Sequence, residues 1–155
     1  MTNEELLARA GIEKTLAACT HAGDSRKADA YAGCFTEQGV LDLANQSYVG
    51  RDAIRGFMAA PSVIPQPAGL SSATRSGASS GASSPGFVSH HLTTCRIELT
   101  SPTTASVRAY WLVTTAVGLD HNGYYDDRFE RVGDAWLIAH RRPRTLWTSS
   151  DSLVR

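Results

Sequence analysis

The chain has 155 residues, 42% of them hydrophobic and 19% charged, which is the composition of one ordinary globular domain with a single core. Fifteen basic and fifteen acidic side chains cancel without a Lys/Arg run, so we expect no nucleic-acid-binding surface. No apolar run approaches the ~18 residues of a membrane span, and the polar, acidic start lacks the features of a secretion signal, so we predict a cytoplasmic protein.

Hydrophobic spacing predicts two helices at the start of the chain. The first covers residues 4–22, with Asn3 as its N-cap, and the second covers residues 26–35. Asp24 lies in the Gly-Asp-Ser break between them, where it can cap the second helix. Residues 36–39 then predict a turn.

Short strands and a third helix follow. Residues 40–43 and the region around 48–49 predict two strands joined by a turn. A helix then starts at Gly50 and is stopped by Pro61. The segment 61–87 is rich in Ser, Gly and Ala, and it can bury too little surface to offset its ordering entropy. It is either a disordered or surface insertion or a lid. The lid interpretation is kept because the segment ends beside a pair of histidines.

The rest of the chain predicts long strands with short turns. The four expected strands cover residues 90–99, 104–117, 124–132 and 135–147, and residues 118–123 predict a turn. Helices followed by antiparallel strands indicate an α+β fold. We expect three helices packed on a strongly curved, mixed but mostly antiparallel sheet, which forms a cone with a deep apolar pocket.

Six segments carry a family resemblance: Ile12 to Asp24, Tyr31 to Glu37, Tyr48 to Ile54, His90 to Thr94, Gly123 to Arg131 and Trp136 to Arg142. In this order and spacing they resemble the SnoaL-like branch of the nuclear transport factor 2 superfamily. That branch includes scytalone dehydratase, polyketide cyclases and cofactor-free isomerases. The resemblance implies the cone fold over one domain, residues 1–155, a homodimer formed through the open sheet face, and no cofactor.

The resemblance also implies two catalytic residues. Catalytic members use an aspartate at the end of the first helix and a histidine at the start of the strand after the third helix, and these positions match Asp24 and His90. Thr94 stands where the family commonly has an asparagine. A carboxylate bonded to one ring nitrogen fixes the imidazole tautomer, so the other nitrogen can take a proton from carbon next to a carbonyl.

Simple alternation leaves open which of two adjacent histidines faces the pocket. His91 shares its strand face with the apolar Cys95 and Ile97, whereas His90 shares its face with Thr94. A β-bulge near the start of this strand could reverse the register. We favour His90 on the motif and keep His91 as the alternate and as a substrate-binding residue.

Aromatic side chains supply the other candidates for substrate binding. Tyrosine hydroxyls can hold a carbonyl oxygen and stabilise an enolate. The candidates are Tyr31, Tyr48, Phe57, Tyr110, Trp111 and Tyr125. Tyr110 and Trp111 are neighbours in one strand, so one of them faces the pocket and the other faces away.

Other reactive side chains have structural interpretations. Asp127 is expected to pair with Arg141 or Arg142, and His21 and His121 are expected to face solvent. Three cysteines without CxxC spacing predict free, buried thiols in a reducing compartment. Clustered metal ligands are missing from the sequence pattern, so we expect no metal site.

We therefore predict a cofactor-independent acid–base enzyme, a dehydratase, isomerase or cyclase that uses an Asp24–His90 dyad. The resemblance implies a small hydrophobic substrate of polyketide or terpenoid type. One alternative is a non-catalytic ligand-binding or dimerisation module of the same fold. Another is the small subunit of a ring-hydroxylating dioxygenase, which shares the fold.

Overall fold

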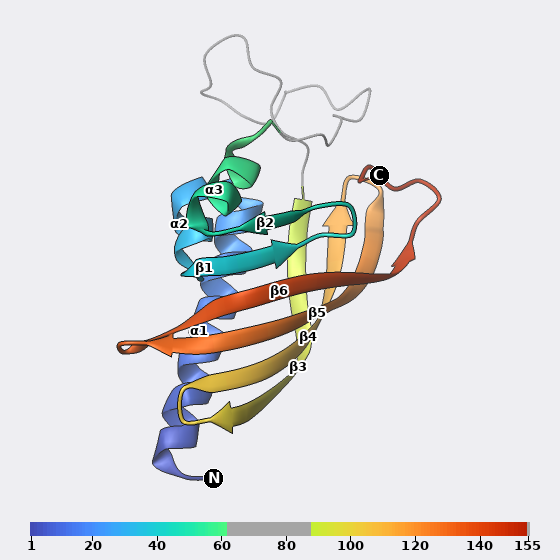
Figure 1. Ribbon diagram of the computed structural model, residues 1–155. Coiled ribbons are helices and arrows are strands. Elements are labelled where there is room, and N and C mark those ends of the chain that lie inside the picture. Colours follow the sequence, from blue (N-terminus) through green and yellow to red (C-terminus); the bar gives the residue numbers. More distant parts are fainter. Residues whose placement is uncertain (62–87, 155) are drawn as a thin grey trace, which may run out of the picture.

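The computed structural model describes residues 1–61 and 88–154, so the predicted loop at 61–87 lies outside the described residues except for its first position. The described chain contains three helices and six strands (Figure 1). The helices are α1 (Asn3–Asp24), α2 (Ala28–Gly33) and α3 (Arg51–Ala59). The strands are β1 (Phe35–Asp42), β2 (Ser47–Val49), β3 (Val88–Ser101), β4 (Thr104–Thr115), β5 (Gly118–Val132) and β6 (Ala135–Thr148).

The strands form one open sheet in the order β2-β1-β6-β5-β4-β3. β1 and β6 run parallel, whereas the other neighbouring strands run antiparallel. The four long strands curve, and α1 packs against β6 and β3 on the inner side of the sheet (Figure 1). The predicted α+β fold, with helices on a curved and mostly antiparallel sheet, is confirmed.

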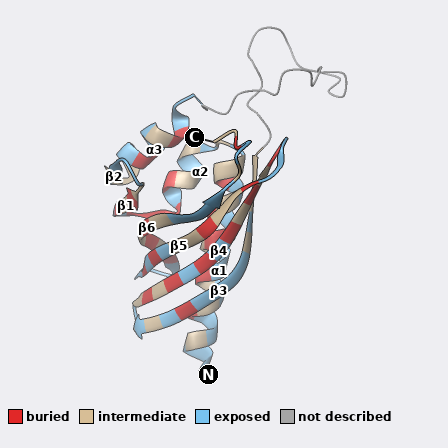
Figure 2. Ribbon diagram, turned by 90° about the vertical axis from the view of Figure 1, so that its right-hand side faces the viewer, coloured by how far each residue is buried: buried red, intermediate tan, exposed pale blue. Residues whose placement is uncertain are grey.

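Burial alternates along β4 and along parts of β5 and β6, so one face of the sheet forms the core (Figure 2). The inward side chains of β4 are Ala105, Val107, Ala109, Trp111 and Val113, all of them buried, as their alternation predicted. Ile12 and Leu16 of α1 pack into the same core. Each large apolar side chain buried in this way contributes about 1.5–3 kcal/mol, so the helix is held on the sheet mainly by its apolar face.

The first helix is capped by Thr2, one residue before the predicted Asn3. The Thr2 hydroxyl accepts a hydrogen bond from the Glu5 backbone N–H at 3.2 Å, and the Glu5 carboxylate accepts one from the Thr2 N–H at 2.7 Å. This reciprocal arrangement is a capping box, which satisfies backbone donors that the first turn leaves free. The helix then continues without interruption to Asp24.

The second helix is shorter than the sequence predicted. It ends at Gly33, and Phe35 begins β1 instead of closing the helix. Residues 36–39, predicted as a turn, therefore belong to a strand. The Ile138 N–H donates to the Cys34 carbonyl at 2.9 Å, and Phe35 pairs with Ile138. These strand bonds and the complete burial of Phe35 outweigh its helical spacing.

The turn predicted at residues 118–123 is also wrong, because β5 already begins at Gly118. Thr115 pairs with Gly118, so the chain reverses in a two-residue turn. Gly118 has φ +91°, a left-handed conformation that glycine adopts without a steric penalty. The earlier start of β5 brings His121 into the sheet.

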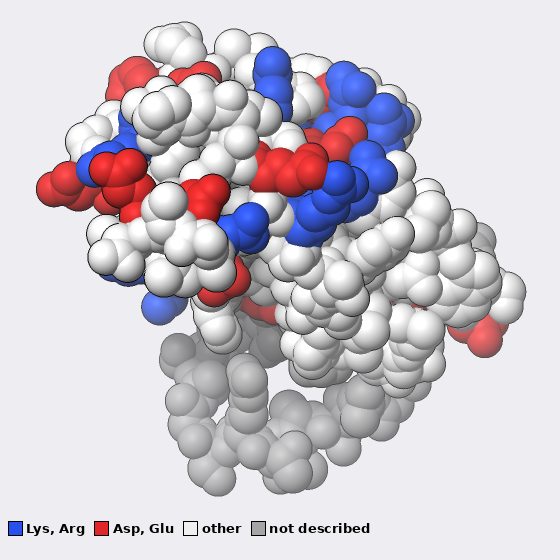
Figure 3. All heavy atoms as spheres, turned by 90° about the horizontal axis from the view of Figure 1, so that it is seen from below, with Lys and Arg blue, Asp and Glu red and all other residues white. Residues whose placement is uncertain are grey.

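Charged side chains of both signs lie next to each other on the face seen in Figure 3. Some oppositely charged side chains elsewhere on the surface form exposed ion pairs, for example Arg55 with Asp29 at 2.7 Å and with Asp52 at 2.5 Å. Among the described residues, no helix is both long and apolar enough to cross a membrane.

Candidate active site

A β-bulge in β3 turns His90 toward the inside of the sheet. Between two paired positions, β3 advances by three residues, from Leu92 to Cys95, while β4 advances by two. Side chains on the two sides of this bulge therefore no longer follow a single alternation. His90 pairs with the buried Val113 and shares its inner face. His91 is exposed.

Asp24 holds His90 through two hydrogen bonds. Nδ1 of His90 lies 2.6 Å from Oδ1 of Asp24, and the His90 backbone N–H donates to Oδ2 at 2.9 Å. Because an ionised carboxylate only accepts hydrogen bonds, the ring proton belongs on Nδ1. In the neutral ring Nε2 then carries a lone pair, and it makes no hydrogen bond to any described residue. The His90 side chain is 32% exposed and the Asp24 side chain 20%.

The end of α1 fixes the position of Asp24. Asp24 is the last helical residue, and the Ser25 N–H donates to the His21 carbonyl at 3.0 Å. Arg26 then adopts φ +54°, and its guanidinium donates to the carbonyl of Ala60. A residue other than glycine in this left-handed conformation is uncommon and shows that the turn after Asp24 is held by its surroundings.

Asp24 and His90 border a cavity of about 360 Å³, a volume in the range of sites for small organic ligands. Its lining is mostly apolar and comes from the helices, β1, the long strands and the C-terminal segment. The apolar and aromatic lining residues are Tyr31, Leu41, Leu43, Phe57, Met58, Val88, Trp111, Tyr125, Pro143 and Val154. The pair therefore borders a mostly apolar cavity, and apolar surroundings strengthen electrostatic interactions.

The cavity brings together some of the predicted binding residues and leaves others out. Tyr31, Phe57, Trp111 and Tyr125 line it. Three others lie outside its described lining: His91, Tyr48 and Tyr110. Tyr48 packs behind Phe57, with ring centroids 4.7 Å apart. Tyr110 is 43% exposed, as expected for the outward neighbour of Trp111.

Two lining tyrosines remain protonated hydrogen-bond donors. Burial raises the pKa of both Tyr31 and Tyr125, because an apolar environment disfavours the phenolate. A phenol can donate to a ligand carbonyl and hold charge that develops on its oxygen.

A buried ion pair supports the cavity wall. Nε of Arg141 donates to Oδ2 of Asp127 at 3.1 Å and Nη2 donates to the same atom at 2.6 Å. The remaining Nη1 donates to the Cys19 sulfur at 3.2 Å, and the guanidinium lies 4.0 Å from the centre of the Tyr125 ring. Burial disfavours the charged guanidinium, but Asp127 beside it raises the pKa of Arg141 well above its usual value. The predicted pairing of Asp127 with Arg141 is thus present and is fully buried.

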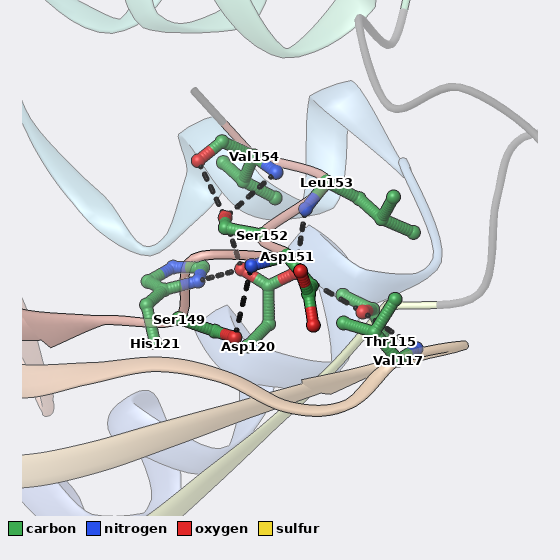
Figure 4. Close-up of polar contacts among 9 residues, drawn as sticks. All are labelled: Thr115, Val117, Asp120, His121, Ser149, Asp151, Ser152, Leu153 and Val154. Carbon is green, nitrogen blue, oxygen red and sulfur yellow. Dashed lines mark hydrogen bonds and ion pairs between the residues drawn. The ribbon is translucent and has the colours of Figure 1, made fainter.

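His121 lines the cavity, whereas the sequence predicted that it would face solvent. Its side chain is 15% exposed, and its ring meets Trp111 edge-on with centroids 5.3 Å apart. Nδ1 of His121 lies 2.7 Å from Oδ1 of Asp120 (Figure 4). The wrong prediction followed from the turn expected at residues 118–123. The adjacent Asp-His dipeptide was a signal for a second carboxylate–imidazole pair.

Asp120 is a buried carboxylate that also holds the C-terminal segment (Figure 4). It accepts hydrogen bonds from the Thr115 and Ser152 hydroxyls at 3.1 and 2.6 Å, and from the Leu153 N–H at 2.9 Å. Burial opposes ionisation, but these donors and His121 lower the pKa of Asp120 to about 2. Asp120 is therefore a carboxylate at neutral pH.

The thiols are free, and one is exposed contrary to prediction. Cys19 and Cys34 are buried, but Cys95 on the edge strand β3 is exposed. The neighbouring Cys34 thiol and burial raise the pKa of Cys19, which keeps that thiol protonated and unreactive. Among the described residues, His, Cys, Asp and Glu side chains form no group that could hold a metal ion.

Sequence comparison identifies one family. A family model described as a SnoaL-like domain matches residues 4–142, nearly the whole chain. No curated protein matches the chain in sequence.

Solved structures share the fold at low sequence identity. A protein of unknown function from Mycobacterium tuberculosis is 24% identical with a TM-score of 0.73, covering 99% of this chain and 80% of that one. A protein provisionally assigned as a scytalone dehydratase, from Novosphingobium aromaticivorans, is 23% identical with a TM-score of 0.74, covering 100% and 94%. A hexachlorocyclohexane dehydrochlorinase, LinA-type3 from Novosphingobium barchaimii, is 14% identical with a TM-score of 0.71, covering 94% and 91%. Two further similar structures have a cystatin-like fold, and one of them is described as an NTF2-like protein.

Proposed function

The chain belongs to the SnoaL-like domain family, and we propose that it is a cofactor-independent acid–base enzyme, a dehydratase, isomerase or cyclase. The observation that carries the proposal is the Asp24–His90 pair, bonded at 2.6 Å on the border of an apolar cavity. The substrate class proposed is a small hydrophobic carbonyl compound of polyketide or terpenoid type, because the lining offers more apolar than polar surface, part of it aromatic.

His90 acts as the base in this proposal. Its Nδ1–H donates to Asp24, so the lone pair on Nε2 is free to take a proton from carbon next to the substrate carbonyl. The Asp24 carboxylate stabilises the imidazolium that forms. Tyr31 and Tyr125 line the same cavity as protonated phenols, and either can donate to the carbonyl oxygen as the enolate develops.

Two comparisons in fold support chemistry of this type. Two similar structures are those of a protein provisionally assigned as a scytalone dehydratase and of a dehydrochlorinase, which are lyases. Their sequence identity to this chain is low, so the likeness concerns the fold. The residues that carry the proposal are those of this chain.

Proton exchange tests the proposal without knowledge of the natural substrate. 2-Tetralone, a bicyclic ketone, is incubated with the protein in D₂O, and loss of its α-proton signals is followed by NMR. We expect catalysed exchange by the wild type and a loss of about 10²–10⁴-fold in His90→Gln, the usual contribution of a positioned base. His91→Gln is the matched control, because that neighbouring side chain is exposed, and it should exchange at the wild-type rate. Equal rates in wild type and His90→Gln would refute the proposal.

A second role concerns the outer face of the sheet. We propose that two copies pair through this face, where Arg108 lies 4.6 Å from the centre of the Tyr124 ring and Tyr110 is exposed. Sedimentation of the wild type should give the mass of a dimer, and Tyr110→Glu should shift it toward the monomer. A wild-type monomer would refute this pairing and leave the catalytic proposal untouched.

A further inference from the structure

The cavity holds a second carboxylate–imidazole pair. In both pairs, Nδ1 of the histidine contacts the aspartate, at 2.6 Å for Asp24–His90 and at 2.7 Å for Asp120–His121. Nε2 of His121, like that of His90, makes no hydrogen bond to a described residue. Both histidines line the cavity, and in each the aspartate takes Nδ1 and leaves Nε2 for another partner.

A bulge in β5 places Asp120 and His121 on the same side of the sheet. Thr114 of β4 pairs with Leu119, but the adjacent Val113 pairs with His121, so Asp120 is an extra residue in β5. Such an extra residue breaks the alternation of side chains, and bulges often re-aim side chains beside active sites. Asp120 is consequently buried while the next residue lines the cavity.

His90 and His121 lie in one row across three strands. His90 pairs with Val113, and Val113 pairs with His121. Two strand spacings put their Cα atoms about 10 Å apart. The side chains of both extend from this row toward the cavity. A small molecule bound in the cavity between these two side chains would therefore have one imidazole at each side.

A buried donor beside His121 has no partner. Nε1 of Trp111 is buried and makes no hydrogen bond within the described residues. A buried N–H without a partner costs about 1–3 kcal/mol. Trp111 lines the cavity and its ring contacts His121. An oxygen of a ligand seated against the His121 ring would therefore lie next to Trp111.

We propose that His121 is a second catalytic residue, which donates a proton from Nε2 to the substrate oxygen while His90 removes a proton from the neighbouring carbon. The inference rests on the proposed function and adds to it a proton donor and the place of the carbonyl oxygen. Asp120 positions the His121 ring and stabilises its protonated form through Nδ1. The substrate carbonyl thus lies toward Trp111 and His121, and its acidic C–H toward His90.

The proton transfers balance over one cycle. The C–H bond breaks, its electron pair forms the carbon–carbon double bond of an enol, and the proton goes to Nε2 of His90. The electrons of the carbonyl π bond move to the oxygen, which takes the proton from Nε2 of His121. His90 ends as imidazolium and His121 as neutral imidazole. Return of the two protons to and from water restores both groups.

The α-proton exchange of 2-tetralone in D₂O gives the first test. His121→Phe keeps an aromatic ring against Trp111 but removes both nitrogens, so we expect kcat for exchange to fall by about 10²-fold, as for loss of one oxyanion donor, with little change in KM. His140→Phe is the matched control. His140 also lies beside an aspartate, 3.7 Å from Asp42, but outside the described cavity lining. His121→Gln serves as a second variant if the Phe variant fails to fold.

Binding of 4-nitrophenol gives a test that a merely structural role would not pass. Its phenolate resembles an enolate, and phenol and phenolate are distinguished by absorbance. We expect the bound probe to ionise at lower pH than in water on the wild type. This shift should vanish in His121→Phe, whereas Ser152→Ala, which removes another donor to Asp120, should retain it.

The two measurements separate this inference from the proposed function. If His90→Gln loses exchange while His121→Phe exchanges at the wild-type rate, the base stands and the role of His121 is overturned. If the wild type fails to exchange 2-tetralone, the proposed chemistry on such ketones fails. In that case a His121-dependent ionisation of bound 4-nitrophenol still supports His121 as the donor, and its absence overturns it.

Discussion

Two aspartates beside the cavity are paired in opposite ways. Asp127 is held by a guanidinium whose three nitrogens each donate a hydrogen bond, and the side chains of Asp127 and Arg141 are 0% and 3% exposed. Asp24 is held by an imidazole that keeps one nitrogen without a partner among the described residues. A pair whose nitrogen and oxygen atoms all have partners is suited to stabilising the cavity wall. A pair in which one imidazole nitrogen has no partner can exchange a proton with a ligand.

The fully bonded Asp127–Arg141 pair should contribute most to the free energy of unfolding. Removing one partner leaves a buried charge without compensation, so Arg141→Leu should lower the free energy of unfolding by about 3–5 kcal/mol. Urea denaturation measures this loss. The double variant Asp127→Leu, Arg141→Met removes both charges and should recover most of it. A loss below about 1 kcal/mol in Arg141→Leu would show that the pair is not structural.

The Asp120–His121 pair combines features of both extremes, because its carboxylate is buried and its imidazole lines the cavity. The pKa of Asp120 is lowered from 3.8 to about 2. A depressed carboxyl pKa stabilises the folded state above the unfolded value, and this contribution disappears as pH falls from about 4 toward 2. We expect a loss of about 1–2 kcal/mol over that window.

Denaturation of the wild type and Asp120→Asn between pH 5 and pH 2 checks this window. The difference between the two curves should shrink as the pH falls through it. A difference that stays constant would mean that Asp120 has the same proton affinity in the folded and unfolded chain.

The Asp24–His90 pair should contribute least to the free energy of unfolding. Asp24 and His90 are partly exposed, and such pairs typically contribute about 0–1 kcal/mol. His90→Gln should therefore unfold within about 1 kcal/mol of the wild type in urea, even though it loses the exchange activity. A destabilisation near that of Arg141→Leu would place this pair in the structural class and remove the contrast.

The sequence predicted the architecture because local patterns and global packing agree in most of the chain. The alternation of β4 gives the buried row from Ala105 to Val113 directly. In the predicted first helix, Leu16 and Cys19 are likewise buried, whereas Leu6 and Leu7 near its start are exposed. Phe35 shows where this fails, since its helical spacing after Tyr31 fits the short α2 but strand pairing with Ile138 decides its conformation.

The orientation of the site histidines depends on features that the alternation of apolar and polar residues does not reveal. Both cavity histidines are placed by β-bulges, one after Leu92 and one at Asp120. A bulge is an extra residue in one strand relative to its paired strand. The sequence of one strand alone therefore does not reveal it. The family resemblance favoured His90 over His91 where alternation favoured His91. No comparable motif covered His121, and the turn expected there concealed it.

The most direct test of the Asp24–His90 pair determines the tautomer of His90 and needs no substrate. The ¹⁵N shifts of the His90 ring, read from long-range proton–nitrogen NMR spectra, report which nitrogen carries the proton in the neutral form. A free histidine prefers the proton on Nε2. We predict protonated Nδ1 and unprotonated Nε2 in the wild type, and a shift toward the free preference in Asp24→Asn. Protonated Nε2 in the wild type would contradict the account, because His90 would then have no lone pair to offer the cavity.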